Sequence, residues 1–392
     1  MAQDRGMDRA KAIYQDRSQR AGELKAQGKQ VIGYLCAYPV LEMMTALDLA
    51  PFRILGDITE PISRADACLP TVVCPFIRSA LDLALKDRYQ FLDGVVMAHS
   101  CDVAEKTAHI WHSYLRPPYF HFIDTPHTTG DSAVKQHKRL LKDFQKTLEQ
   151  LAGRQLSQER LKEAVKAHNQ QRALVRELYG LRKPDPPLIS GVESLEVMVS
   201  LMSLPVDEGS RLLKQVITEV RQRNSGPPKK PARLLIWGSI IDNSSLIQMI
   251  EGLSANLVMD DTCVGSRFYW PDVAATEDPL DGLAHRYLVA LKCPRTFRQA
   301  DPNKASKDYQ ADLEYRFGYL MEYAKEWRVN GVILQSLRYC DIHGYEVPQV
   351  KDYLNSLGLP AIYLEYDYSQ AALAPLRTRV QAFLEIIGQG NF

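Results

Sequence analysis

The stretch DGVVMAHSCD at 93–102 indicates the fold class, and NGVILQSLRYCD at 330–341 is its counterpart. Each stretch runs from a turn residue through an apolar run into Cys-Asp. A short apolar run bounded by turn residues is typical of a strand that is buried on both faces of a parallel sheet. The two stretches therefore predict two similar parallel sheets, and a distant internal repeat explains their likeness.

Six other apolar runs alternate with helical patterns on either side of these two stretches. They are 31–35, 51–56, 119–124, 233–239, 255–261 and 361–367. Strands that alternate with helices are typical of parallel sheets with helices on both faces. We therefore predict an α/β fold with two doubly wound parallel-sheet lobes that a helical section joins.

The same alternation suggests where each part of the chain begins and ends. We expect an N-terminal helix at 1–30, a first α/β lobe at 31–133, a helical connecting section at 134–231 and a second α/β lobe at 232–392. Ligands of such sheets bind beyond the carboxyl ends of the strands. The strand ends of the two lobes are therefore expected to face one cleft.

Composition excludes several classes of protein. The 392 residues are 45% hydrophobic and 24% charged, which is typical of folded globular chains rather than disordered or fibrous ones. Because 48 basic residues balance 47 acidic ones, no broad basic field favours binding to nucleic acid. No apolar run reaches the roughly 18 residues that cross a membrane, and the charged N-terminus lacks a signal-peptide core. We expect a cytoplasmic protein.

The seven cysteines are the residues most informative about function. Six of them follow predicted strands or flank predicted helices. These six are Cys36, Cys74, Cys101, Cys263, Cys293 and Cys340. A single cysteine is most often a buried core residue, so a binding module without catalysis is one interpretation. Zinc sites usually contain a CxxC pair, and this sequence has none. Thiolates far apart in sequence can hold an iron–sulfur cubane, and three thiolates on four irons leave one iron open.

Several segments carry a resemblance to a known family. They are GYLCAYPVLEMMTALDLAPFRILG (33–56), VVCPFIRSAL (72–81), GVVMAHSCDVAEKTAHIW (94–111), GVILQSLRYCDIHGYEVPQVKDYLNSLGLPAIYLEYDYS (331–369) and RTRVQAFLEII (377–387). In this order and spacing, over nearly its whole length, the sequence resembles the benzoyl-CoA reductase and 2-hydroxyacyl-CoA dehydratase family.

The resemblance implies a two-lobed subunit with an oxygen-sensitive [4Fe-4S] cluster, whose ligands would be Cys74, Cys101 and Cys340. It also implies an acyl-CoA substrate and two kinds of partner: a larger homologous cluster-bearing subunit and an ATP-hydrolysing activator. The chain itself has no GxxxxGK[ST] phosphate-binding loop. Its length and the segment CDVAEKTAHIW resemble the smaller subunit of ATP-dependent benzoyl-CoA reductases. We expect low-potential electron transfer to an aromatic acyl-CoA.

Two alternatives within the family stay open. One is a component of a 2-hydroxyacyl-CoA dehydratase, and the other is a homodimeric double-cubane cluster reductase. Double-cubane proteins use six cysteines, and Cys36, Cys263 and Cys293 lie where the additional three are expected. Cys68 has no counterpart and is expected to be structural.

Two further side chains are catalytic candidates. His99 precedes Cys101 by two residues, and an imidazole beside an acyl thioester could protonate a radical anion. Glu42 matches an acidic position that the family places near the active site, although a solvated helix-face carboxylate is the alternative. Asp102 and Asp341 are expected to cap the helices that follow their cysteines.

Overall fold

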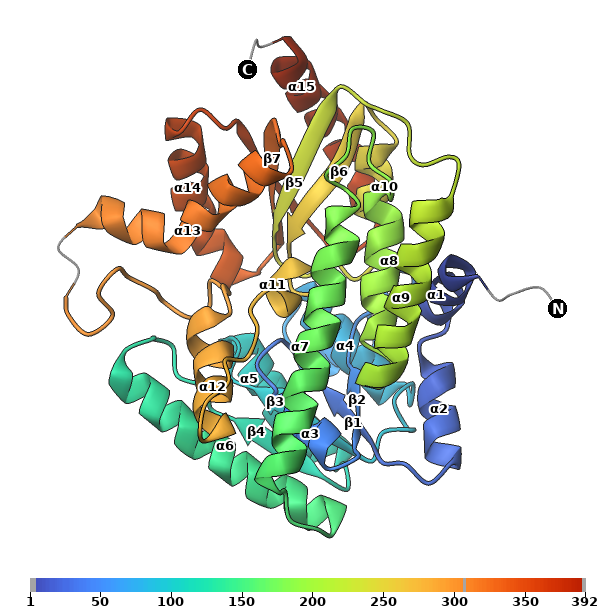
Figure 1. Cartoon of the computed structure of the whole chain (residues 1–392), viewed down its shortest axis with the longest axis vertical. Coiled ribbons are helices and arrows are strands. Elements are labelled where there is room, and N and C mark those ends of the chain that lie inside the picture. Colours follow the sequence, from blue (N-terminus) through green and yellow to red (C-terminus); the bar gives the residue numbers. More distant parts are fainter. Residues whose placement is uncertain (1–4, 306–307, 390–392) are drawn as a thin grey trace.

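Two four-stranded parallel sheets with the same strand order form the frame of the computed structural model, which describes residues 5–305 and 308–389. The first sheet has the order β2-β1-β3-β4 and the second has the order β6-β5-β7-β8 (Figure 1). The strands are β1 Val31–Tyr34, β2 Ala50–Arg53, β3 Gly94–Ala98, β4 Phe120–Ile123, β5 Ala232–Gly238, β6 Ala255–Asp261, β7 Gly331–Leu337 and β8 Ala361–Tyr366. The predicted α/β class and the two lobes are confirmed.

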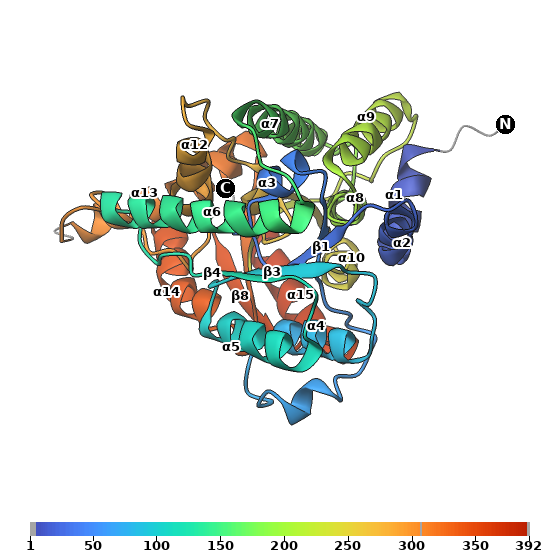
Figure 2. The same cartoon turned by 90° about the horizontal axis from the view of Figure 1, so that it is seen from below.

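Helices cover both faces of each sheet, which explains why the strands are continuous apolar runs. Figure 2 shows α6 on one face of the first sheet and α4 and α5 on the other. The helices near the first sheet are α3 Leu41–Ala46, α4 Pro75–Leu85 and α5 Asp102–Ile110, with the short 3-10 helix η1 Ala65–Ala67 and the π-helical segment η2 Trp111–Leu115. Those near the second are α10 Ser245–Glu251, α11 Ser266–Tyr269, α13 Tyr309–Glu326, α14 Asp341–Ser356, η4 Gln370–Ala372 and α15 Leu373–Gln389. The segments α12 Pro279–His285 and η3 Arg286–Ala290 pack against α6, which covers the first sheet.

Long helices connect the sheets. They are α6 Asp131–Ala152, α7 Gln158–Gly180, α8 Gly191–Leu201 and α9 Val206–Gln222. In Figure 1, α7, α8 and α9 lie side by side along both sheets. Within the expected helical section the chain breaks between α8 and α9, because Pro205 occupies the N-cap of α9 and cannot donate a helical hydrogen bond.

The expected N-terminal helix is also two helices, α1 Gly6–Gln15 and α2 Ser18–Ala26. Asp16 interrupts it, because its carboxylate accepts hydrogen bonds from the Ser18 backbone N–H at 3.1 Å and the Ser18 hydroxyl at 2.7 Å. Residues 1–4 of the expected helix and 390–392 of the expected second lobe lie outside the described residues.

Each sheet has a point where the chain reverses its direction of winding. From β1 the chain passes to β2 on one side and later to β3 on the other, and β5 stands in the same relation to β6 and β7. In parallel sheets this switch point leaves a crevice at the carboxyl ends of the two central strands. Cys36 follows β1, Cys101 follows β3 and Cys340 follows β7, so the fold presents cysteines at both switch points.

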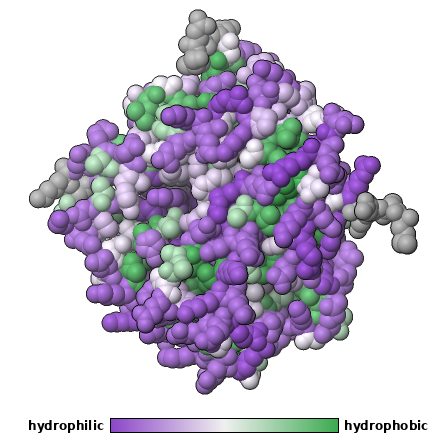
Figure 3. All heavy atoms as spheres, viewed as in Figure 1, coloured by the Kyte–Doolittle hydropathy of each residue, from purple (hydrophilic) through white to green (hydrophobic). Residues whose placement is uncertain are grey.

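The visible outer face is largely hydrophilic, with separate small hydrophobic areas (Figure 3). Among the described residues, none of the helices combines the length and the apolar character that crossing a membrane requires.

Two buried histidines in the connecting helices predict acid sensitivity. Burial lowers the pKa of His137 on α6 and of His168 on α7 to about 4, whereas an unfolded histidine has a pKa of about 6.5. Between these values the unfolded chain binds more protons, so stability is complete above pH 6.5 and is lost as the pH falls toward about 4. Each histidine is expected to lower the free energy of unfolding by about 2 kcal/mol between about pH 7.5 and about pH 5.

Urea unfolding at these two pH values checks the expectation. His137→Leu should lose less stability on acidification than the natural chain, by about 2 kcal/mol. Substitution of the exposed His109 by Asn is the control and should leave the pH dependence unchanged. An equal pH dependence in all three proteins would contradict the burial argument.

Candidate metal centre

Three cysteines occupy the N-caps of three helices. Cys74 precedes α4, Cys101 precedes α5 and Cys340 precedes α14. The backbone N–H of Ala104 donates to the Cys101 sulfur at 3.4 Å. The positive end of a helix dipole stabilises negative charge on such a sulfur.

The expectation that Asp102 and Asp341 cap these helices is wrong. The cysteines take the cap positions, and each aspartate is the first residue of its helix. A carboxylate in a first helical turn still interacts favourably with the helix dipole, so the Cys-Asp pair places two acidic groups at one helix end.

These three thiols lie within electrostatic reach of one another. Burial raises the pKa of Cys74 to about 11 and that of Cys101 to about 12, and Cys74 raises the latter further. Burial also raises the pKa of Cys340 well above its ordinary value, with further contributions from Cys74 and Cys101. Because the first two belong to one lobe and Cys340 to the other, the cysteine-bearing ends of the two sheets face each other.

The remaining three predicted cysteines interact electrostatically with the first three. Burial raises the pKa of Cys263 to about 12, and the nearby Cys293 and Cys36 raise it further. Cys36 also acts on Cys101, and Cys263 acts on Cys340. Each of the six thiols therefore interacts electrostatically with at least one other. We call Cys74, Cys101 and Cys340 the first group and Cys36, Cys263 and Cys293 the second group.

Buried guanidinium groups flank the second group. Arg53 donates to the Cys36 carbonyl, and Arg267 Nη1 lies 3.7 Å from the Cys263 sulfur. Both arginines are almost fully buried, and both lower the pKa of Cys263. A buried cation beside a thiol favours the thiolate, which is the form that binds metals.

The chemistry of this donor set fits an iron–sulfur cluster. The donors are all sulfur, and soft thiolates select zinc, copper(I) or iron–sulfur clusters over hard cations. Cysteines contributed one at a time by separate loops, with no CxxC pair, match the ligation of a cubane better than a structural zinc site. Which residues would bind iron stays a prediction.

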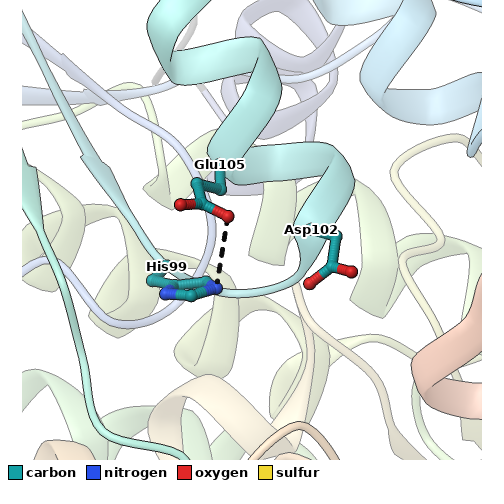
Figure 4. Close-up of side chains that lie close together, drawn as sticks. All are labelled: His99, Asp102 and Glu105. Atoms are coloured by element: carbon teal, nitrogen blue, oxygen red, sulfur yellow. Dashed lines mark ion pairs between the residues drawn. The ribbon is translucent and has the colours of Figure 1, made fainter.

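His99 lies at the end of β3, beside carboxylates. Its Nδ1 lies 2.8 Å from Asp124 and its Nε2 lies 3.6 Å from Glu105. One ligand atom each from His99, Asp102 and Glu105 lies within 4.8 Å of the others (Figure 4). The two carboxylates that contact the imidazole orient it, and its catalytic role stays a prediction.

Glu42 is fully buried, and its carboxylate already has partners. It forms an ion pair with Arg172 on α7, and the Tyr287 hydroxyl donates to it at 2.7 Å. Burial alone raises the pKa of Glu42, but Arg172 and neighbouring basic groups outweigh it and hold the pKa well below its usual range. These are the contacts of a structural ion pair, and a catalytic role for Glu42 stays a prediction.

Substitution of Glu42 by Gln is expected to lower the free energy of unfolding by about 3–5 kcal/mol, because the Arg172 charge would stay buried without a partner. Glu23→Gln is the control, since Glu23 pairs with Arg20 at the surface and its loss is expected to cost less than about 1 kcal/mol. Urea unfolding measures both. Unchanged stability of Glu42→Gln together with lost activity would instead support catalysis by Glu42.

A cavity of about 390 Å³ lies where the two lobes meet. Its lining includes the aromatic rings of Phe52, Tyr89 and Tyr368, together with Asp242 from the second lobe. Asp242 is buried, accepts the Tyr368 hydroxyl at 2.7 Å and contributes to the raised pKa of Cys74. Of the described residues that line the cavity, none is a cysteine, and Asp242 links it to the first group of cysteines only through this effect on the pKa of Cys74.

Three residues of this region had no signal that we recognised in the sequence. They are Asp242, Arg267 and His343. Arg267 follows Cys263 by four residues and His343 follows Cys340 by three, so spacing from a cysteine could have singled out both. Asp242 follows β5, and the ends of central strands are where such residues are expected.

Comparisons with known proteins agree with this architecture. The family model described as 2-hydroxyglutaryl-CoA dehydratase, D-component, matches residues 36–387. One of the benzoyl-CoA reductase subunits of Thauera aromatica is 26% identical over 97% of both chains. The putative dehydratase subunit YjiM of Escherichia coli is 27% identical and the (R)-phenyllactyl-CoA dehydratase beta subunit of Clostridium sporogenes 24% identical, each over 93% of both chains. The chain therefore belongs to the 2-hydroxyglutaryl-CoA dehydratase D-component family, and the predicted resemblance is confirmed.

Proposed function

We propose that this chain is the iron–sulfur subunit of a reductase that delivers low-potential electrons to an acyl-CoA. The observation that carries the proposal is that Cys74, Cys101 and Cys340 occupy the N-caps of three helices from both lobes and lie close enough to affect one another's pKa values. The pKa values of Cys74, Cys101, Cys263 and Cys340 are raised by burial, so these thiols stay protonated at neutral pH unless a metal offsets the negative charge of the thiolates. Membership of a family of acyl-CoA enzymes supports the choice of chemistry.

Two sets of three cysteines would hold the iron. The first set is Cys74, Cys101 and Cys340, and the second is Cys36, Cys263 and Cys293. When bound, a cluster of this kind supplies one-electron reduction at low potential. The N-termini of α4, α5 and α14 would stabilise the ligand sulfurs, and the buried arginines would offset their charge. Because the thiols of both groups affect one another's pKa values, we favour a double cubane over a single cubane.

The cavity around Asp242 supports an aromatic acyl group as the part of the substrate that is reduced. Its volume of about 390 Å³ lies within the range of small-molecule sites, and aromatic rings line it. An aromatic ring favours such walls because offset and edge-to-face ring contacts are stabilising. The relative from Thauera aromatica, which is named as part of a benzoyl-CoA reductase, supports the same substrate class.

We further propose that the chain works with a larger homologous subunit and with an ATP-hydrolysing activator. Relatives that are named as subunits support the first partner. The second follows from the need for energy to reach low potential, since the sequence contains no GxxxxGK[ST] loop for binding ATP itself.

Dehydration of a 2-hydroxyacyl-CoA is the second candidate function. Its support is the relative named (R)-phenyllactyl-CoA dehydratase beta subunit, which matches over 93% of the chain. A third candidate, a homodimeric double-cubane reductase of small molecules, shares the six-cysteine cluster but needs no larger subunit.

Anaerobic purification with the natural partners, followed by electron counting, tests these functions. A reductase forms product in proportion to the electrons supplied, whereas a dehydratase forms many products per electron. Reduction of small molecules by the chain and its activator, without conversion of acyl-CoA, would favour the third candidate. Absence of broad visible charge-transfer absorption after iron and sulfide are added would reject the proposal and favour a binding module.

A further inference from the structure

Arg267 and His343 connect the two groups of cysteines. Arg267 Nη1 lies 2.9 Å from His343 Nε2 and 3.7 Å from the Cys263 sulfur. His343 Nδ1 lies 3.4 Å from the Cys340 sulfur. A continuous path of polar contacts therefore runs from the Cys263 sulfur of the second group to the Cys340 sulfur of the first group.

The position of the guanidinium is fixed by other partners. Arg267 pairs with Asp261 at 3.1 Å and donates to the Gly238 carbonyl at 2.8 Å. Its side chain is fully buried, and its charge lies over the Trp237 ring, 5.7 Å from the ring centre. The His343 ring also packs against Trp237, with ring centres 5.4 Å apart. Both side chains are held in place without any contribution from a metal.

These contacts determine which nitrogen of His343 carries the proton. A guanidinium has five N–H donors and no acceptor, so Nε2 of His343 must accept from Arg267. A neutral imidazole that accepts at one nitrogen carries its hydrogen on the other. The Gly238 carbonyl also lies within reach of the ring, but it already accepts from Arg267 Nη1 at 2.8 Å. Nδ1–H is therefore the donor toward the Cys340 sulfur, which lies 3.4 Å away.

We propose that Arg267 and His343 form a positioning dyad that sets the reduction potential of the cluster, an inference that rests on the proposed iron–sulfur function. Hydrogen bonds to ligand sulfurs and nearby positive charge stabilise the more negative, reduced state. His343 supplies the hydrogen bond to Cys340, and Arg267 supplies the charge beside Cys263. The dyad thereby raises the potential at both groups of cysteines together.

Two substitutions of His343 separate its two hydrogen bonds. In His343→Asn the side-chain amide lies near the position of Nδ1 and keeps a donor for Cys340. In His343→Gln the amide lies near Nε2, keeps a partner for Arg267 and leaves the sulfur without its donor. Both replacements are polar and of similar size, and the exposed His109→Gln is the control.

Redox titration of the anaerobically purified proteins, monitored by electron paramagnetic resonance, measures the effect. At a fixed potential, His343→Gln is expected to lower the ratio of reduced to oxidised cluster about tenfold, which equals about 59 mV for one electron. His343→Asn should remain near the natural protein, as should the control. Iron content is measured on every sample and should stay unchanged.

Each other outcome has a distinct meaning. Equal potentials in both His343 variants, with normal iron content, would overturn the dyad while leaving the iron–sulfur function intact. Loss of iron from both variants alike would also overturn it, because His343 would then support the cluster without tuning it. Absence of iron from the natural protein would instead reject the proposed function.

Discussion

Replacement of Cys263 by Ser is expected to reduce the iron content of the anaerobically purified chain from about eight atoms to about four, since each cubane contains four irons. Cys263 interacts with Cys293 and Cys36, so its loss removes one of three ligands from the second group. The first group keeps all three of its cysteines at the helix N-termini. Iron and acid-labile sulfide analysis, with absorption spectra of the same samples, measures the change.

Cys68→Ser is the matched control. Cys68 is a half-buried thiol at the end of a short turn and is expected to have a structural role only, so the iron content of this variant should equal that of the natural chain. About four irons in the natural chain and no change in Cys263→Ser would show that the first group alone binds iron. That result would remove the double cubane and favour a subunit with a single cubane.

The strands were predictable because burial on both faces leaves a local signature. All eight apolar runs that were expected to be strands correspond to strands, and the run 255–261 matches β6 residue for residue. The likeness of 93–102 and 330–341 is explained by β3 and β7, which hold equivalent positions in sheets of equal order. The places of the cysteines followed, because strand ends in parallel sheets gather at one edge.

The side-chain network around the cysteines was not predictable in the same way. Arg267 and His343 are 76 residues apart in sequence and meet because α11 and α14 both begin at the same edge of the second sheet. Glu42 has a pattern consistent with an exposed helix face, and its burial depends on Arg172, 130 residues away. Such contacts depend on how the elements pack, and no local spacing encodes them.

Gly238→Ala is expected to destabilise the second lobe and weaken its hold on iron. Gly238 ends β5 and pairs with Gln335 of β7, and an added Cβ would lie 2.0 Å from the Gln335 carbonyl oxygen. Because that atom is backbone, the two central strands must separate at the edge that carries the cysteines. The free energy of unfolding is expected to fall by about 3 kcal/mol or more.

The same substitution also disturbs a cysteine neighbour. The Gly238 carbonyl accepts from Arg267 Nη1 at 2.8 Å, so displacement of β5 moves the guanidinium that lies beside Cys263. Iron analysis should therefore show a loss from the second group of cysteines, in addition to the loss of stability that urea unfolding measures.

Gly22→Ala is the control, and it is expected to raise the free energy of unfolding rather than lower it. Gly22 lies within α2, and no atom lies within 4 Å of an added Cβ there. Alanine restricts the unfolded chain and favours the helix, so this variant is expected to gain about 0.5–1 kcal/mol with unchanged iron content. Comparable stabilities for the two variants would mean that β5 and β7 tolerate a side chain at the switch point, and the close approach of these strands would then not be what holds Arg267 against the cysteines.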